Sequence, residues 1–297
     1  MSRFIWLIRR EVWEHKAIWI APAVVLGCII LLMLTGESHV YDEAKMPHLT
    51  HDQQVAILTY VYSALALPSF MVMGIIAFFY ALDSLYADRR DRSVLFWKSL
   101  PLSDAETVLS KFAVAIVLIP LVALAAAVVT QLLVAAIESI GAGVTGMPAG
   151  FMWQPAAIGG AISVVMLLSV TAMLWYAPFI GYLMLASAWA PRAPFLWAVL
   201  PPAGAMILEK FVMRSDYVGS FIAERLLMVP YLRHLGDEMP ASAVENGASK
   251  IERLTSIDLH AVLGTFYKSP ELWLGVVAAA LLLAAAMWVR RYRDETA

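Results

Sequence analysis

The sequence contains few charged residues and almost no cysteine. Only 15% of its 297 residues are charged and 61% are hydrophobic, whereas a soluble domain is about a quarter charged and about half apolar. This balance excludes an ordinary soluble protein. The single cysteine, Cys28, lies within an apolar run, so the chain cannot form an internal disulfide bond.

Signature motifs of catalysis are also missing. The sequence contains no G-x-x-x-x-G-K-[ST] phosphate loop, no H-E-x-x-H zinc motif and no G-x-S-x-G nucleophile motif. We therefore predict that the chain is not an enzyme by itself. In particular, it should not bind and hydrolyse ATP alone.

Long apolar runs are what the sequence has instead. A helix needs about 20 apolar residues to cross the hydrocarbon core of a bilayer, and its backbone amides are then satisfied internally. The segment 156–190 is ambiguous, because it could form one long pass bent near Pro178 or two short passes. With one pass there, we predict six spans, at 17–35, 55–82, 112–137, 156–190, 195–213 and 271–289.

The distribution of basic residues decides between these alternatives. With six spans, the segments 1–16, 83–111, 190–194 and 290–297 lie on one side and hold 13 of the 21 Lys and Arg residues. Two passes would place the basic segment 290–297 outside, against the positive-inside rule. We therefore predict an all-α membrane protein with six transmembrane helices in a single domain, 17–289, and with both termini and the basic tail in the cytoplasm.

The middles of the predicted spans contain almost no ionisable residues. Asp83, Glu138 and Glu209 fall at span ends, where we expect their side chains to reach water. Ion-coupled carriers typically place carboxylates or histidines at mid-membrane depth, so this pattern disfavours that class. Five polar residues within spans could line a path, but hydrogen bonds between packed helices are the interpretation we favour: Thr130, Gln131, Ser163, Ser169 and Thr171.

The first 16 residues combine basic side chains with Trp6 and Trp13. Basic groups beside aromatic rings are typical of a helix that lies along the inner leaflet. We predict such an interfacial helix at 1–16. The alternative is a basic flank that only fixes the orientation of the first span.

The loop 83–111 is the most informative segment outside the spans. Apolar residues at 94–97 follow its charged first part, and Pro101 should end any helix that runs through them. Ser103 and Glu106 match the S-x-x-E capping box, which predicts the start of the next helix. An exposed apolar cluster ringed by charge is a candidate protein-docking surface; the alternative is an amphipathic helix packed on the bilayer or on the protein.

Two outer segments carry further candidates. Residues 36–54 include His39, His48 and His51, which are candidate metal ligands. They lack a defined ligand spacing, and we favour a solvated polar loop. The larger outer loop, 214–270, contains two amphipathic stretches, which predict helices on the outer face before the last span.

The loop 83–111 resembles the loop between spans two and three of ABC type-2 (ABC-2) transporter permeases. In that family an acidic residue precedes a basic and polar turn, a hydrophobic helix, a break with proline, and a lysine that enters the next span. These places correspond to Asp83, residues 89–93, 94–98 and 100–103, and Lys111. The segment 185–202 is similar to the family's inner turn between spans four and five, so the resemblance covers essentially the whole chain.

This resemblance implies the permease subunit of an ATP-driven exporter in the cytoplasmic (inner) membrane of a bacterium. A separate ABC ATPase subunit would hold ATP and Mg²⁺, no cofactor being expected in this chain, and a second permease, identical or related, would complete the membrane part. Membrane lipid is a further expected partner, and nucleic acid is not. The loop would carry a cytoplasmic coupling helix that docks on the ATPase through Arg89, Arg90, Arg92, Val94, Leu95, Phe96, Trp97 and Lys98.

Two other classes of function remain open on the sequence. A membrane scaffold or sensor would bind a ligand or partner through its outer loop and work without nucleotide. An intramembrane enzyme would depend on a polar residue within a span. Only the permease accounts for both the docking-like loop and the missing phosphate motif.

Overall fold

The computed structural model describes residues 3–35, 50–91, 103–145, 149–228, 264 and 266–293. All regular elements within these residues are helices. In chain order they are α1 (Arg3–Glu14), α2 (Ala17–Leu34), α3 (His51–Ala64), α4 (Leu67–Arg90), α6 (Asp104–Ala113), η2 (Val114–Leu118), α7 (Ile119–Thr145), η3 (Ala149–Trp153), α8 (Pro155–Trp189), α9 (Pro194–Leu208), η4 (Glu209–Met213), α10 (Tyr217–Leu226) and α15 (Pro270–Arg293).

Six helical segments among the described residues are long and apolar enough to cross a membrane. The chain is therefore an all-α, multi-pass membrane protein. The ambiguous segment is one continuous helix, α8, with Pro178 inside it, as the charge distribution predicts. The six segments are Ala17–Leu34, His51–Arg90, Asp104–Gly141, Pro155–Trp189, Pro194–Met213 and Pro270–Tyr292.

The helices on either side of the loop 83–111 are longer than the hydropathy predicts. Helix α4 continues to Arg90, and α6 begins at Asp104. The start of α6 agrees with the helix predicted from Ser103 and Glu106, and charged residues at both helix ends are paired within the protein.

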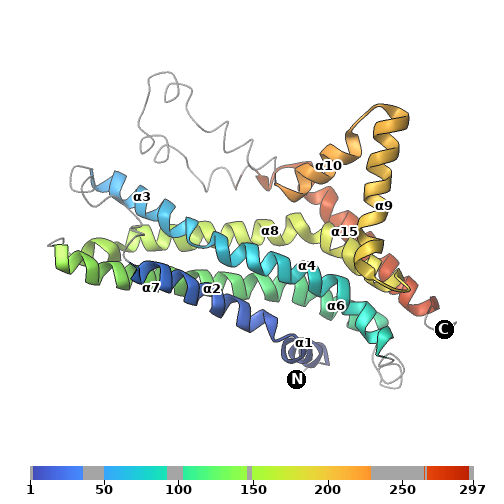
Figure 1. Ribbon diagram of the computed structural model, residues 1–297, viewed down its shortest axis with the longest axis horizontal. Coiled ribbons are helices and arrows are strands. Elements are labelled where there is room, and N and C mark those ends of the chain that lie inside the picture. Colours follow the sequence, from blue (N-terminus) through green and yellow to red (C-terminus); the bar gives the residue numbers. More distant parts are fainter. Residues whose placement is uncertain are drawn as a thin grey trace.

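Helices α2, α4, α7 and α8 run side by side along the long axis of the molecule (Figure 1). Helix α15 packs along α8. In Figure 1 both chain ends and the facing ends of α4 and α6 lie on the lower right of the bundle, which we call the termini side. Helix α9 leaves the bundle at a steep angle and leads to α10.

The main apolar core lies between α4, α8, α15 and the start of the third span. Its buried members include Tyr80, Ile116, Met184 and Leu283. Large apolar side chains also cover the outside of the bundle; Met71, for example, is 71% exposed. Such a surface suits a protein whose solvent is lipid.

Small residues let α8 and α15 approach closely. A Cβ atom placed on Gly181 would lie 3.4 Å from the carbonyl oxygen of Ala279 and 3.4 Å from Cβ of Leu282. Ala279 and Ala286 of α15 are buried in the same core. The alanine-rich last span therefore packs against its neighbour through small side chains, as is common for helices in lipid.

The polar residues inside the spans form two kinds of hydrogen bond. Gln131 Nε2 donates to the carbonyl oxygen of Tyr62 at 3.0 Å, and the hydroxyl groups of Thr171 and Tyr267 lie 2.9 Å apart. These bonds join separate elements, as predicted. The remaining three hydroxyls bond within their own helix: Thr130, Ser163 and Ser169.

Two of the three span-end acids are buried, which corrects the prediction that they reach water. Glu138 is 8% exposed and Glu209 is 6% exposed. Glu209 accepts hydrogen bonds from the backbone N–H groups of Tyr217 and Val218 at 2.6 and 2.7 Å. It thereby satisfies the first N–H groups of α10, a contact that forms because the chain turns back after α9.

Helix α10 corresponds to the first amphipathic stretch of the outer loop. Trp175 Nε1 of α8 donates to the carbonyl oxygen of Arg225 at 2.7 Å, and the Arg225 guanidinium lies 3.8 Å from the centroid of the Trp175 ring. Tyr176 donates to the carbonyl oxygen of Leu226 at 2.9 Å. Of the second stretch, Phe266 is buried in a cluster with Trp175 and Leu272, and the other predicted residues lie outside the described ones: Ile251, Leu254, Ile257 and Val262.

A buried serine joins α8 to α4. The Ser187 hydroxyl oxygen accepts from the backbone N–H groups of Leu85 and Tyr86 at 3.1 and 3.0 Å. Ser187 is fully buried. This contact holds the end of α8 against the last turns of α4.

We predict that Ser187→Ala lowers the free energy of unfolding by about 1–2 kcal/mol, because two backbone donors lose a buried acceptor. Thermal unfolding of the purified chain in detergent measures the effect. Ser110→Ala is the matched control, since Ser110 is equally buried but its hydroxyl donates only to Thr107 of its own helix. Equal losses in the two variants would contradict the proposed interhelical role.

Candidate functional site

Charged side chains are buried on the termini side, where α1, α4, α6 and α15 meet. Glu11, Asp88, Lys111 and Arg290 come from these four helices in turn, and none is more than 7% exposed. Two further residues, from α1 and α6, extend the group. We call the following six residues the ion network: Arg10, Glu11, Asp88, Asp104, Lys111 and Arg290.

Lys111 lies at the centre of the ion network. Its Nζ atom is 2.9 Å from Oε1 of Glu11 and 3.5 Å from Oδ1 of Asp88. Arg290 Nη1 lies 3.0 Å from Oδ2 of Asp88, and Arg290 Nε donates to Oδ1 of Asp104 at 3.1 Å. Each buried charge therefore contacts an opposite charge, without which its burial would be very costly.

Glu11 joins helix α1 to α4 and α6. Besides Lys111, its carboxylate accepts hydrogen bonds from the Tyr80 hydroxyl, at 2.8 Å, and from Arg10. Burial alone would raise the pKa of Glu11, but the positive charges of Lys111 and Arg10 and their hydrogen bonds outweigh it and lower the pKa from 4.5 to about 2. Glu11 is therefore ionised at neutral pH.

The ion network includes residues at the end of α4 and at the start of α6. Asp88 lies in the last turn of α4, and Asp104 is the first residue of α6. Asp104 and Lys111 are seven residues apart, which is about two helical turns and places them on one face of α6. The network thus holds both helices that lead into and out of the connection between α4 and α6.

A local signal in the sequence fixes where α6 begins. The Ser103 hydroxyl accepts from the backbone N–H of Glu106 at 3.1 Å, and the Glu106 carboxylate accepts from the backbone N–H of Ser103 at 2.9 Å. This is the capping box that the sequence predicts. It sets the rotation of the first turn, which turns Lys111 toward Glu11.

Arg89, in the last turn of α4, connects the end of α8 to the same region. The guanidinium of Arg89 donates to the carbonyl oxygens of Ser187 and Ala190, at 2.6 and 2.9 Å. Carbonyl groups at a helix end lack partners within the helix, and a cation there is favourable. Arg89 and Arg290 also line one small pocket with Leu85 and Ala188, so α8 ends beside the ion network.

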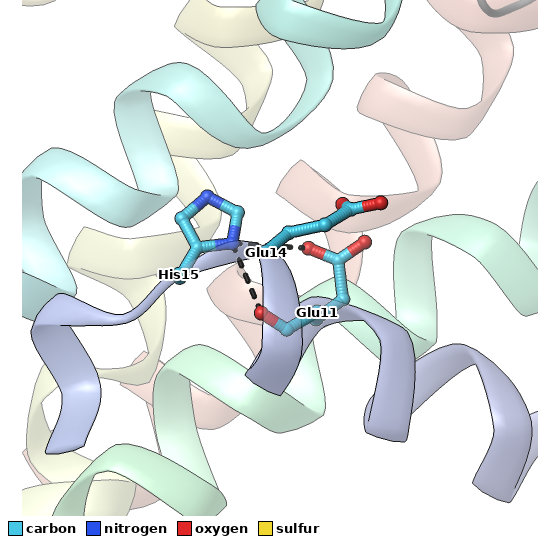
Figure 2. Close-up of side chains that lie close together, drawn as sticks. All are labelled: Glu11, Glu14 and His15. Carbon is cyan, nitrogen blue, oxygen red and sulfur yellow. Dashed lines mark hydrogen bonds and ion pairs between the residues drawn. The ribbon is translucent and has the colours of Figure 1, made fainter.

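One group of potential metal ligands lies in α1. Ligand atoms of Glu11, Glu14 and His15 lie within 4.8 Å of one another (Figure 2). The Glu11 carboxylate already accepts from Lys111, Arg10 and Tyr80, and His15 Nδ1 is 3.1 Å from the carbonyl oxygen of Glu11. We interpret this group as part of the ion pairing, because its most buried ligand is already neutralised.

The histidines predicted as possible metal ligands are not brought together in the described part of the chain. His51 is exposed at the first position of α3. His39 and His48 lie outside the described residues. The metal hypothesis for this outer segment stays a prediction.

Residues 54–180 match the family model described as ABC-2 family transporter protein. The matched segment runs from α3 into α8 and includes α4, α6 and their connection. Over this segment the chain is similar to ABC-2 family transporter proteins. No curated protein and no solved structure matches it.

This similarity supports a membrane permease component of an ABC transporter. The missing phosphate loop agrees with this assignment. The family match also covers three residues of the ion network: Asp88, Asp104 and Lys111. Glu11 and Arg290, by contrast, lie outside the matched segment and reach the network only through the fold.

Two of the residues predicted to dock an ATPase lie at the end of α4. Arg89 contacts α8 as described above. Arg90 is half-exposed and pairs with Asp83 and Asp91, at 3.7 and 3.0 Å. The other predicted docking and break residues lie outside the described residues: Arg92, Val94, Leu95, Phe96, Trp97, Lys98 and Pro101.

Sequence reasoning identified Lys111 by family resemblance but missed its partners. The pairs Lys111–Glu11 and Arg290–Asp88 join residues 100 and 202 positions apart, so no local pattern could have matched them. One signal was available in α1. Glu11 follows Leu7 by one helical turn and shares its buried face, and an acid on the apolar face of an amphipathic helix indicates a buried partner.

We predict that Lys111→Met destabilises the chain by about 3–5 kcal/mol, because Glu11 and Asp88 lose a buried counter-charge. Thermal unfolding in detergent is the measurement. Adding Glu11→Gln to this variant should recover part of the loss. Glu14→Gln is the control, since Glu14 is half-exposed and lies 3.4 Å from Arg10; it should change stability by less than about 1 kcal/mol. A loss of less than about 1 kcal/mol for Lys111→Met would contradict this prediction, because it would show that Glu11 and Asp88 do not need Lys111 as a counter-charge.

The pKa of Glu11 predicts a specific acid sensitivity. Because the folded-state pKa, about 2, is below the ordinary value of 4.5, the stability that Glu11 contributes is present above pH 4.5 and is lost as the pH falls toward 2. Its size is about 3 kcal/mol. The difference in melting temperature between wild type and Glu11→Gln should therefore shrink over this range. A difference that stays constant from pH 6 to pH 2.5 would contradict the low pKa.

Proposed function

We propose that this chain is the permease subunit of an ABC exporter in the cytoplasmic membrane of a bacterium, and that a separate ABC ATPase subunit, holding ATP and Mg²⁺, drives it. The observation that carries the proposal is the ABC-2 match across α4, α6 and their connection, together with the ion network that holds both helices. The chain itself lacks a phosphate loop, so the energy must come from a partner.

The partner would act through the segment between α4 and α6. Its apolar residues Val94, Leu95, Phe96 and Trp97 are the proposed contact, flanked by basic residues that suit acids on the ATPase. Force applied there reaches Asp88 at the end of α4 and Asp104 at the start of α6. Arg290 pairs with both of these carboxylates, so the two helices and α15 would move together.

The ion network would extend this movement to the N-terminal helix. Separating buried opposite charges in a low-dielectric interior costs several kcal/mol. The Glu11–Lys111 pair therefore couples α1 to α6 more firmly than apolar contacts, which can slide. In this proposal the four helices of the termini side form one rigid transmission unit.

The placement of the charged segments supports a cytoplasmic termini side. The segments 1–16, 83–111, 190–194 and 290–297 hold most of the basic residues, and both chain ends lie on the same side as the facing ends of α4 and α6 (Figure 1). The positive-inside rule places such a side in the cytoplasm. An ATPase there would have direct access to the connection.

We further propose that two permease chains, identical or related, assemble around the transport path. Helix α9 supports this idea, because it extends away from the bundle (Figure 1) and little of it is buried within the chain. Large exposed apolar residues continue into η4, which follows α9, and include Phe211, Val212 and Met213. Lipid or a second permease would cover them.

The test is purification of the tagged chain from its own membranes in mild detergent, followed by measurement of Mg·ATP hydrolysis. We predict that wild type carries an ABC ATPase subunit and hydrolyses ATP. Phe96→Ala with Trp97→Ala should reduce the associated ATPase at least about ten-fold, since deletion of two aromatic contacts removes several kcal/mol of binding energy.

The control is Tyr217→Ala with Phe221→Ala, which removes two aromatic side chains that are exposed on α10. This variant should retain the ATPase. Wild type that purifies without any nucleotide-binding subunit would overturn the proposed function. Retention of the ATPase by the Phe96/Trp97 variant would overturn only the proposed contact.

A further inference from the structure

Helix α1 has an exposed face that the ion network does not use. Trp6, Arg9, Trp13 and Lys16 follow one another at spacings of three, four and three residues, and all are exposed. Trp6, Arg9 and Trp13 share one face of α1, and Lys16 follows the end of this helix as the residue before α2. The buried residues of the helix, Leu7 and Glu11, face the protein. We call the four exposed residues the α1 stripe.

Arg9 is held between the two tryptophan rings of the stripe. Its guanidinium carbon lies 5.2 Å from the ring centroid of Trp6 and 4.6 Å from that of Trp13. Both distances fall within the range of cation–π attraction. The charge is thus oriented by aromatic rings, and its hydrogen-bond donors remain available to an anion.

The positive charges of the stripe have no acidic partner within the described part of the chain. The acids of α1 are engaged elsewhere: Glu11 pairs with Lys111 and Arg10, and Glu14 pairs with Arg10. Arg9 and Lys16 form no ion pair among the described residues. The stripe therefore presents two positive charges without local neutralisation.

The stripe also lies next to the start of a membrane span. The first membrane span begins at Ala17, directly after Lys16. Tryptophan rings concentrate at the membrane–water interface, and arginine and lysine bind the phosphates of anionic lipids there. A stripe of two rings and two cations beside the start of a span matches this chemistry on all counts.

We propose that the α1 stripe is a binding site for an anionic phospholipid, with the lipid phosphate held by Arg9 and Lys16 and the glycerol and upper acyl region packed against Trp6 and Trp13. Because Glu11 lies on the opposite face of the same helix, a bound lipid also holds α1 against α4 and α6. The inference does not depend on the identity of the transported substrate or on an ATPase.

The test is a titration of the purified full-length chain in detergent with phosphatidylglycerol and, separately, with phosphatidylcholine of the same acyl chains. Wild type should gain about 3–5 °C in melting temperature near a ten-fold excess of phosphatidylglycerol over its Kd. Arg9→Gln with Lys16→Gln should reduce this gain at least two-fold. The response to phosphatidylcholine should be the same in both proteins.

Matched variants distinguish lipid binding at the α1 stripe from a general attraction of anionic lipid to positive charges on the protein. Arg192→Gln with Lys210→Gln removes two exposed positive charges elsewhere and should leave the response to phosphatidylglycerol intact. Trp6→Phe with Trp13→Phe should weaken it, since phenylalanine is a poorer cation–π partner and lacks the indole N–H. The melting temperature of each variant without lipid shows whether it is folded.

Four outcomes would overturn the proposal. An equal loss of response in the Arg192/Lys210 variant would mean non-specific attraction. The same stabilisation by inorganic phosphate or glycerol phosphate would mean a phosphate site without lipid. An unchanged response in the Arg9/Lys16 variant would place the lipid elsewhere. If that variant instead lost a copurifying ATPase while keeping the lipid response, the stripe would be a protein-docking surface.

Discussion

Neutralisation of buried charge is the constraint on which the termini side depends. Glu11, Asp88, Lys111 and Arg290 are almost fully buried, and each would be very costly to bury alone. Their burial is tolerated because each has a partner of opposite charge. Lys111 and Arg290 both pair with Asp88, and Glu11 accepts hydrogen bonds from Lys111, Arg10 and Tyr80. The four helices must therefore meet here, and each must turn its charged residue toward the others. The capping box at Ser103 and the Arg89 contacts with the end of α8 meet that requirement.

The bundle combines two kinds of helix contact with different mechanical properties. Along the spans, Gly181, Ala279 and other small apolar residues let helices approach closely. On the termini side, charge pairs resist separation because the interior cannot replace water. A permease driven from outside its own chain needs both properties, since it must receive force at one place and change packing at another. Our proposal assigns the first role to the ion network and the second to the spans.

Much of the architecture was predictable. Hydropathy located all six spans to within a few residues at most boundaries, and the basic residues favoured one pass at 156–190, which is the single helix α8. The loop pattern suggested the ABC-2 family, and the match over 54–180 supports it. Helix α4 continues to Arg90, beyond the apolar run, and α6 begins at Asp104, where the capping box predicts a helix. Hydropathy treats a charged residue as solvated, and this assumption misplaced Glu138 and Glu209, which are buried.

The sequence by itself determined the solvent of this protein, the number of its spans and the start of α6, because these depend on composition, apolar run length and hydrogen bonds between residues three positions apart. Tertiary structure alone decided which charges meet. Glu11 lies 100 residues from Lys111, and Asp88 lies 202 residues from Arg290, so the attraction between them acts only after the helices have packed. The end of the chain and its beginning thus become part of one site through the fold, and a charged residue that hydropathy assigns to water becomes a buried contact.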